Sequence, residues 1–181
     1  MIRTHRLVVY SLFALLLFAF PAFAVQEVKE LHLVDQIMKQ NVDACNQIMK
    51  TAYKMREQAL PFTHPKYRAK HRFGPSDSYP RAILSLSRGL RSRFKLLSGI
   101  LYHVPVRNRA ELFKSAETSL DTLTNSSKRA LRAIRDGNSA LFLASAETAD
   151  KEARQIYKLL GDFEDIINES IEKSDASLEN L

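Results

Sequence analysis

The sequence contains no tryptophan, one cysteine and only five glycines among its 181 residues. A single thiol cannot form an intramolecular disulfide, so the fold must be held by its hydrophobic core. Scarce glycine disfavours folds built from many tight turns and favours long helices. Hydrophobic residues make up 45% of the chain, which allows a chain of this length to bury a sizeable core. We therefore expect one domain that is held together by apolar packing.

Motifs that carry catalysis or bind a prosthetic group are also lacking. The sequence has no Gly-x-Ser-x-Gly elbow, glycine-rich phosphate loop, Cys-x-x-Cys-His motif or His-x-x-x-His pair. His64 and His71 share a basic segment, where the surrounding positive charge opposes a metal cation. At helical spacing, Met38, Met49 and Met55 are more typical of a core than of haem ligands. The sequence thus predicts no enzyme, no catalytic residues, no metal site and no cofactor.

Residues 1–24 differ in character from the rest of the chain. Two arginines precede an almost unbroken apolar run (7–20), and an Ala-x-Ala motif ends at Ala24. This order is typical of a secretory signal peptide, and the run is short for a membrane span, which needs about 20 residues. We predict cleavage after Ala24 and export of the mature protein, with an uncleaved membrane anchor as the alternative. No cysteine stands directly at the predicted cleavage site, where a lipid anchor would need one.

Four later segments place apolar residues at helical spacing, and none shows the alternation of a half-buried strand. The predicted helices cover residues 27–59, 80–104, 108–135 and 139–173, and a turn at Gly137 separates the last two. Their apolar stripes read, in chain order, Leu31, Val34, Met38, Cys45, Ile48, Ala52, Met55 and Ala59; Ile83, Leu86, Leu90, Phe94, Leu97 and Leu101; Leu112, Ala116, Leu120, Leu123, Ser127, Leu131 and Ile134; and Leu141, Ser145, Ala149, Ile156, Leu159, Phe163, Ile167 and Ile171.

Helices with one apolar stripe each bury these stripes against one another. The expected fold is all-α: an up-down four-helix bundle over residues 25–175, followed by a frayed tail at 176–181. Because Cys45 lies on the first stripe, we expect it to be a buried small hydrophobe rather than a reactive thiol.

A long connection separates the first two predicted helices. Residues 60–80 contain four prolines, which end helices and impose extended or turn geometry. The connection is longer than is usual between helices of a bundle. It also carries Lys66, Arg68, Lys70 and Arg72. A long basic connection between regular helices is a natural place for a docking site.

The charges are unevenly distributed along the chain. The net charge is +7, and removal of the two arginines of the predicted signal leaves +5. Residues 50–135 hold 19 Lys or Arg against 5 Asp or Glu, whereas residues 136–181 hold 4 against 11. Two helical stripes of cations stand apart from the apolar ones: Arg81, Arg88, Arg91 and Lys95 on the second predicted helix, and Lys128, Arg132 and Arg135 on the third.

These cationic stripes have two interpretations. One is a solvated helix face, and the other is a patch that binds an acidic protein surface or anionic lipid headgroups. Nucleic acid is not the expected ligand, because an exported protein meets little of it and no aromatic stacking residues line the stripes. The candidate partner-binding residues are Lys66, Arg68, Lys70, Arg72, Arg81, Arg88, Arg91 and Lys95.

Three stretches between residues 80 and 160 follow patterns found in a known family. They are Leu90-Arg91 with Leu96-Leu97-Ser98-Gly99-Ile100-Leu101; Leu120-Asp121-Thr122-Leu123 with Ser126-Ser127-Lys128; and Asn138-Ser139-Ala140 with Ala146-Glu147 and Tyr157-Lys158-Leu159-Leu160. In these stretches the chain resembles the PsbQ family, the extrinsic lumenal subunits of photosystem II. The chain departs from the family in two respects. Many cyanobacterial members carry a lipoprotein cysteine at the cleavage site, and plant members carry a two-part transit peptide.

The resemblance implies a non-catalytic role without a cofactor. The protein would dock on the lumenal face of photosystem II, contact its core or other extrinsic subunits, and stabilise the oxygen-evolving assembly. Its expected location is then the thylakoid lumen, and its membrane association is peripheral, through protein contacts. From the residues alone, a periplasmic helical-bundle protein with a binding or stress-response role, unrelated to photosynthesis, stays open as the alternative.

Overall fold

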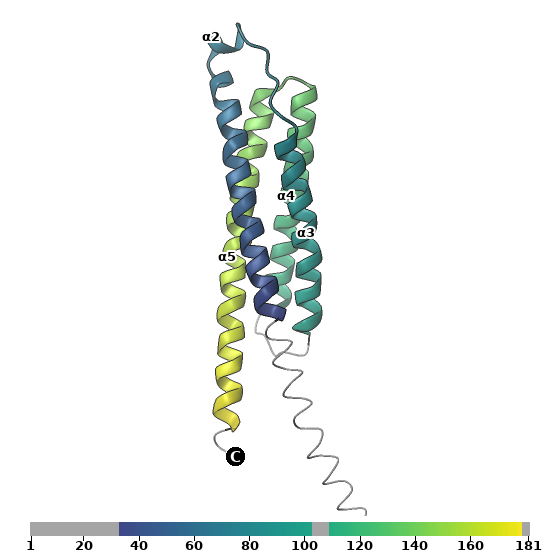
Figure 1. Ribbon diagram of the computed structural model, residues 1–181, viewed down its shortest axis with the longest axis vertical. Coiled ribbons are helices and arrows are strands. Elements are labelled where there is room, and N and C mark those ends of the chain that lie inside the picture. Colours follow the sequence, from purple (N-terminus) through teal and green to yellow (C-terminus); the bar gives the residue numbers. More distant parts are fainter. Residues whose placement is uncertain (1–32, 103–108, 179–181) are drawn as a thin grey trace, which may run out of the picture. The chain divides into compact units, whose positions relative to one another are not determined.

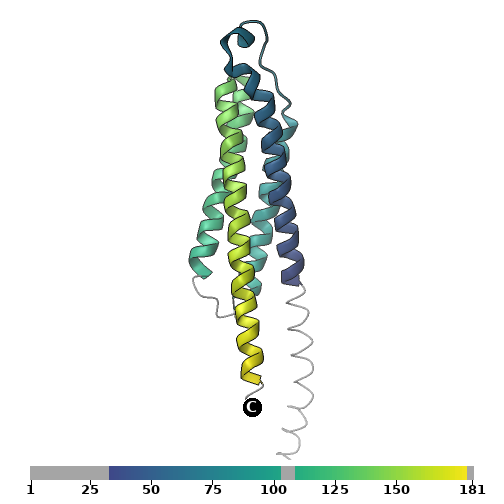
Figure 2. The same cartoon turned by 90° about the vertical axis from the view of Figure 1, so that its left-hand side faces the viewer.

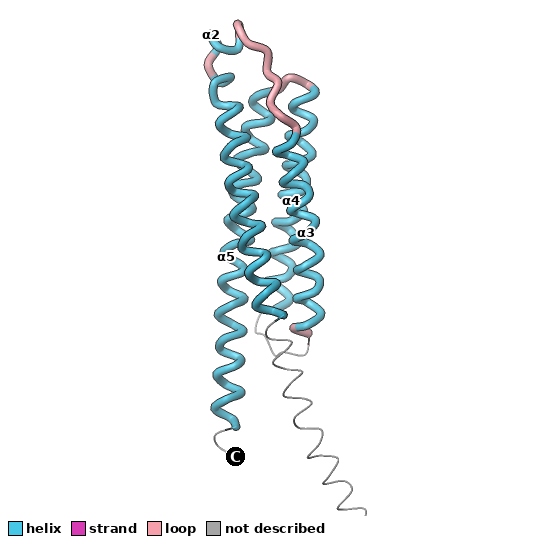
Figure 3. Tube along the Cα trace, in the orientation of Figure 1, coloured by secondary structure: helices cyan, strands magenta, loops and turns pink. Residues whose placement is uncertain are grey.

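The computed structural model describes residues 33–102 and 109–178 of the chain. The chain divides into two units, Met1–Ile37 and Met38–Leu181. In the first unit the described residues, 33–37, are helical, and the predicted signal peptide lies outside the described residues. The second unit holds most of the described residues. Its described residues form helices, turns and loops without a strand (Figures 1 and 3), so the predicted all-α class is confirmed for this part of the chain.

The helices of the second unit follow the predicted order. Residues 38–59 are helical (the first helix). A short 3-10 helix, η1 (Leu60–Thr63), and a single helical turn, α2 (Pro65–Arg68), come next. They lead to α3 (Ser78–Ile100), α4 (Arg109–Arg135) and α5 (Ser139–Leu178).

The structure differs from the predicted elements in four places. The second predicted helix was expected to continue to residue 104, but α3 ends at Ile100. The predicted connection is not irregular throughout, because η1 and α2 lie within it. Helix α3 begins at Ser78 rather than at Pro80, which is tolerated in the first helical turn because its missing N–H needs no partner there. Helix α5 continues to Leu178 instead of ending near Lys173.

The turn between α4 and α5 has the expected glycine geometry. Gly137 has a φ of +63°, a left-handed conformation that glycine adopts without strain. Asn138 then caps α5, because its side-chain oxygen accepts a hydrogen bond from the backbone N–H of Leu141 at 2.9 Å. Since so short a turn reverses the chain, α4 and α5 lie antiparallel, with the turn at the same end of the unit as α2 (Figures 1 and 2).

The predicted apolar stripes form most of the core. From Met38 onward, every stripe residue whose side chain is described is buried, except five that are half-buried: Leu86, Leu112, Leu131, Ile134 and Leu141. Leu31, Ile167 and Ile171 lie outside the described side chains. Several buried residues were not among the predicted stripes: Asn41, Phe73, Ser119, Ala130, Ala133, Phe142, Ala146, Ala153 and Leu160.

Helices α4 and α5 pack along each other, and both bury many small residues. Among η1 and α2 to α5, their contact is the most extensive. The buried alanines and serines are Ala116, Ser119, Ser126, Ser127, Ala130 and Ala133 on α4, and Ser145, Ala146, Ala149 and Ala153 on α5. Three of the serine hydroxyls donate to backbone carbonyls of their own helix, those of Ser126 and Ser127 to Leu123 and that of Ser145 to Leu141, at 2.7 to 3.0 Å. These hydroxyls are therefore buried without leaving a donor unpaired.

Two groups of phenylalanine rings pack in the core at different positions along the helices. Phe94, Phe113 and Phe163 bring together α3, α4 and α5, with ring centroids 4.9 to 6.4 Å apart. Near the α4–α5 turn, Phe73 of the long connection meets Phe142 of α5 at 5.5 Å. The irregular segment before α3 is thus anchored to the core by an aromatic contact.

Adjacent leucines on α3 allow a matched test of this packing. Leu97 is fully buried, whereas Leu96 is 49% exposed. We expect Leu97→Ala to lower the free energy of unfolding by about 2–5 kcal/mol, because it removes buried methyl groups and leaves a cavity. Leu96→Ala should change it by less than about 0.5 kcal/mol. Urea denaturation followed by circular dichroism measures both, and equal effects would contradict the packing described.

Candidate functional site

The eight predicted partner-binding residues fall into three groups in the structure. Seven are exposed and Arg91 is half-buried. Lys66, Arg68, Lys70 and Arg72 lie in α2 and the segment that follows it, Arg81 lies in the first turns of α3, and Arg88, Arg91 and Lys95 lie further along that helix. These groups have different surroundings, so they are described separately.

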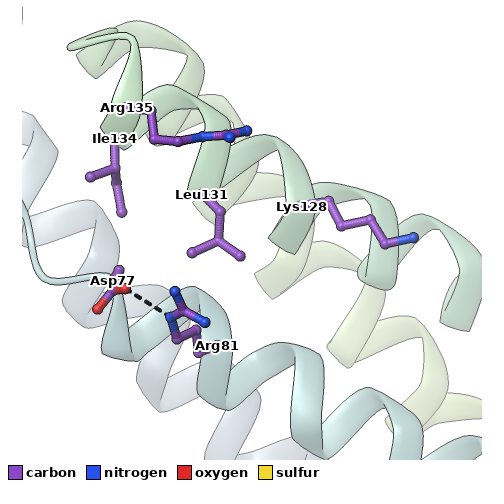
Figure 4. A pocket seen from close by; sticks show the side chains of 6 residues that line it. All are labelled: Asp77, Arg81, Lys128, Leu131, Ile134 and Arg135. Atoms are coloured by element: carbon purple, nitrogen blue, oxygen red, sulfur yellow. Dashed lines mark hydrogen bonds and ion pairs between the residues drawn. The ribbon is translucent and has the colours of Figure 1, made fainter.

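One groove is lined by cations from both of the stripes that the sequence predicted on separate helices. This basic groove has a volume of about 420 Å³ and is lined by Asp77, Arg81, Lys128, Leu131, Ile134 and Arg135. In Figure 4, Leu131 and Ile134 point from α4 toward the start of α3, where Asp77 and Arg81 lie. The last turns of α4 therefore lie beside the first turns of α3. Arg81, Lys128 and Arg135 line the groove together with the half-buried Leu131 and Ile134.

The cations of the basic groove differ in how their charge is compensated. The carboxylate of Asp77 accepts a hydrogen bond from Nε of Arg81 at 2.7 Å, an i,i+4 ion pair. Lys128 and Arg135 form no ion pair with any residue of the described chain. The groove thus presents two uncompensated cations beside Leu131 and Ile134, an arrangement that suits a ligand with both carboxylate and aliphatic groups.

Arg91 has a structural partner, unlike its neighbours in the same stripe. Its guanidinium forms an ion pair with the carboxylate of Asp121 and so joins α3 to α4. Arg88 and Lys95 are exposed, and neither forms an ion pair with a described residue. Of this stripe, Arg88 and Lys95 are therefore the cations open to an external partner.

The sequence stripes did not predict a polar cluster between the first helix and α3. Asn41 is fully buried, and its Oδ1 accepts a hydrogen bond from Nε of Arg93 at 2.6 Å. Its Nδ2 has no hydrogen-bond partner among the described residues. Gly89 makes room for this arrangement, because a Cβ there would lie 3.3 Å from Nη1 of Arg93. The spacing of Asn41 from Met38 and Cys45 is the signal that places it on the buried face.

Burial shifts the pKa of both ionisable groups in this cluster. It raises the pKa of the Cys45 thiol to about 12, and the nearby Arg93 guanidinium opposes this rise. It lowers the pKa of Arg93, whereas the charge of the Cys45 thiolate acts in the opposite direction. The arrangement keeps Cys45 as a neutral thiol and gives no support for a nucleophile.

Within residues 33–102 and 109–178, no group of three or more His, Cys, Asp or Glu side chains could hold a metal ion. None of the helices in this part of the chain is long and apolar enough to cross a membrane.

Comparisons with protein families, with curated proteins and with solved structures found no match to this chain. The function is therefore inferred from the surfaces described above.

The reactivity of Cys45 tests the geometry of the buried cluster. A rise of its pKa from the ordinary 9.0 to about 12 lowers the thiolate fraction near pH 8 roughly 1000-fold. We expect the native thiol to react far more slowly with a disulfide reagent than the thiol of urea-unfolded protein. Equal rates would contradict its burial.

The same shift predicts how stability depends on pH. As pH rises above 9, the unfolded thiol ionises before the folded one, so its contribution to stability is lost between pH 9 and about 12. The Cys45→Ala variant should lack this part of the alkaline loss of stability. Identical pH profiles of unfolding free energy for the two proteins would contradict the raised pKa.

Proposed function

We propose that this chain is an exported, non-catalytic four-helix bundle that docks on an acidic surface of a membrane protein complex. The basic groove between α3 and α4 is the docking site. The observation that carries the proposal is that Arg81, Lys128 and Arg135 line one groove together with Leu131 and Ile134.

The architecture supports a docking role through its rigidity. In the proposed bundle, the first helix, α3, α4 and α5 bury their stripes together, and the groove lies on the outside of two long helices. Side chains on helices hold their positions better than those on loops, so the cations of the groove are preorganised for a partner. The signal-like N-terminal residues 1–24 support export.

The composition of the groove favours a protein surface as the partner. Interfaces commonly combine an apolar centre with arginine and other charges around it. Leu131 and Ile134 supply such a centre, and Lys128 and Arg135 supply charge that steers an acidic partner into register. The groove contains one carboxylate and no histidine, serine or cysteine, so it lacks the paired groups of an acid–base or nucleophilic site.

The resemblance to the PsbQ family gives the proposal a narrower form. In this form the partner is photosystem II, the docking surface is its lumenal face, and the protein stabilises the oxygen-evolving assembly in the thylakoid lumen. One of the stretches that carry the resemblance ends at Lys128, which also lines the basic groove.

Co-purification from native membranes tests the proposal. The tagged protein, expressed in its own cells, is recovered with its bound partners, which mass spectrometry identifies. We expect Lys128→Glu with Arg135→Glu to reduce the recovery of the main partner at least about tenfold, because each reversed charge meets a like charge across the contact. High salt should weaken recovery of the wild type, since exposed charge contacts are screened.

Two control variants distinguish the groove from general basicity. Lys151→Glu with Lys158→Glu makes the same change of charge at exposed positions of α5, and this variant should keep full recovery. Arg88→Glu with Lys95→Glu tests the α3 stripe without breaking the ion pair of Arg91. Equal loss in the groove variant and the α5 control would overturn the groove assignment.

The identity of the recovered partner decides the narrower form. Photosystem II subunits support it, and a different membrane complex would reject it while leaving the docking role in place. If the wild type retains no membrane protein at low salt, the docking role itself is wrong.

A further inference from the structure

A basic and aromatic segment forms one end of the second unit, separate from the groove. Residues 60–76 (the tip) comprise η1, α2 and the irregular chain before α3, at the end where α4 turns into α5 (Figures 1 and 2). The tip contains four Lys or Arg residues and no Asp or Glu. All four cations are exposed, and none forms an ion pair with a described residue: Lys66, Arg68, Lys70 and Arg72.

Large apolar side chains are exposed beside these cations. Leu60 is 42% exposed and Tyr67 is 39% exposed. The Tyr67 ring stacks on His71 with centroids 4.2 Å apart. A tyrosine with an apolar ring and a polar hydroxyl suits the boundary between lipid and water.

Aromatic contacts fix the tip to the core. Phe62 meets Tyr67 edge-on at 5.1 Å and Phe73 at 5.0 Å, and Phe73 in turn contacts the buried Phe142 of α5. The exposed tyrosine is therefore the outer member of a chain of rings that ends in the core. This anchoring presents the cations and the tyrosine without the entropy cost of ordering a free loop.

We propose that the tip binds the anionic headgroups of a lipid bilayer. Lys66, Arg68, Lys70 and Arg72 contact lipid phosphates, and Tyr67 and Leu60 lie at headgroup level. The charge of the tip complements an anionic surface, and its four exposed cations lie close together in the sequence at one end of the unit. An acidic protein surface is better matched by the basic groove, whose cations surround a concave floor.

The two surfaces have separate functions in this account. The groove contacts the membrane protein, and the tip contacts the lipid around it. The lipid proposal does not rest on the proposed function, because it uses other residues and another kind of ligand.

Vesicle co-sedimentation tests the lipid contact with the mature protein, without the apolar run of the predicted signal peptide. The probes are vesicles of phosphatidylcholine alone and vesicles that also contain phosphatidylglycerol. We expect binding to the anionic vesicles, loss of binding at high salt, and none to the neutral vesicles. Each cation near an anionic membrane is worth about fivefold in affinity, so Lys66→Glu with Lys70→Glu should weaken binding at least about 25-fold.

Two further variants separate the parts of the contact. Tyr67→Ser keeps every charge and should weaken binding severalfold by removing the ring from the headgroup level. Lys151→Glu with Lys158→Glu carries the same change of charge on exposed positions of α5 and should bind as the wild type does. Circular dichroism and thermal unfolding check that each variant is folded.

The outcomes distinguish this inference from the docking proposal. Failure of the wild type to bind anionic vesicles overturns the lipid contact, and so does equal weakening by the tip and α5 variants. The tip variant should still bind the detergent-solubilised membrane protein partner. If it loses that partner and keeps the vesicles, the tip is a protein contact and the lipid inference is wrong.

Discussion

The close contact of α4 with α5 is the constraint on which the rest of the structure depends. Both helices bury several alanines and serines, and the spacing between packed helices depends on the side chains at their contact. Three of the buried serines donate their hydroxyls to carbonyls of their own helix, so they need no partner on a neighbouring helix. Larger side chains from the first helix, α3, α4 and α5, such as Ile48, Leu90, Leu123 and Phe142, supply the remaining core. With one cysteine in the chain, this packing carries the stability that a disulfide supplies in many exported proteins.

Antiparallel packing also determines where the charges gather. Because α4 runs back along α3, its last turns lie beside the first turns of α3, and the cations of both form the basic groove. The long connection ends at the same place, so the tip lies at the basic end of the unit. The acidic residues of the sequence concentrate in α5, which continues away from this end to Leu178 (Figure 2). The turn at Gly137 thus places the basic and the acidic parts of the sequence on neighbouring antiparallel helices, α4 and α5.

The fold class and the helix positions could be predicted from periodicity, because a repeated apolar face indicates a helix without knowledge of its neighbours. The groove could not be predicted in the same way. Each cationic stripe was visible, but their meeting depends on which helices are neighbours and at what register. Arg91 shows the same limit, since its partner Asp121 lies thirty positions away on α4. Asn41 was missed for another reason. A polar residue within an apolar stripe is taken as a break in the stripe, and the sequence does not show that Arg93 donates a hydrogen bond to it.

The central claim is that the basic groove is a contact surface for an acidic membrane protein. Photo-crosslinking in native membranes tests it most directly, with a photoreactive amino acid placed at Leu131 on the groove floor or at Lys158 on α5. The account predicts one dominant adduct from position 131, with an acidic subunit of a membrane complex, that disappears at high salt and does not form from position 158. The same adducts from both positions, or none from position 131, would contradict the claim.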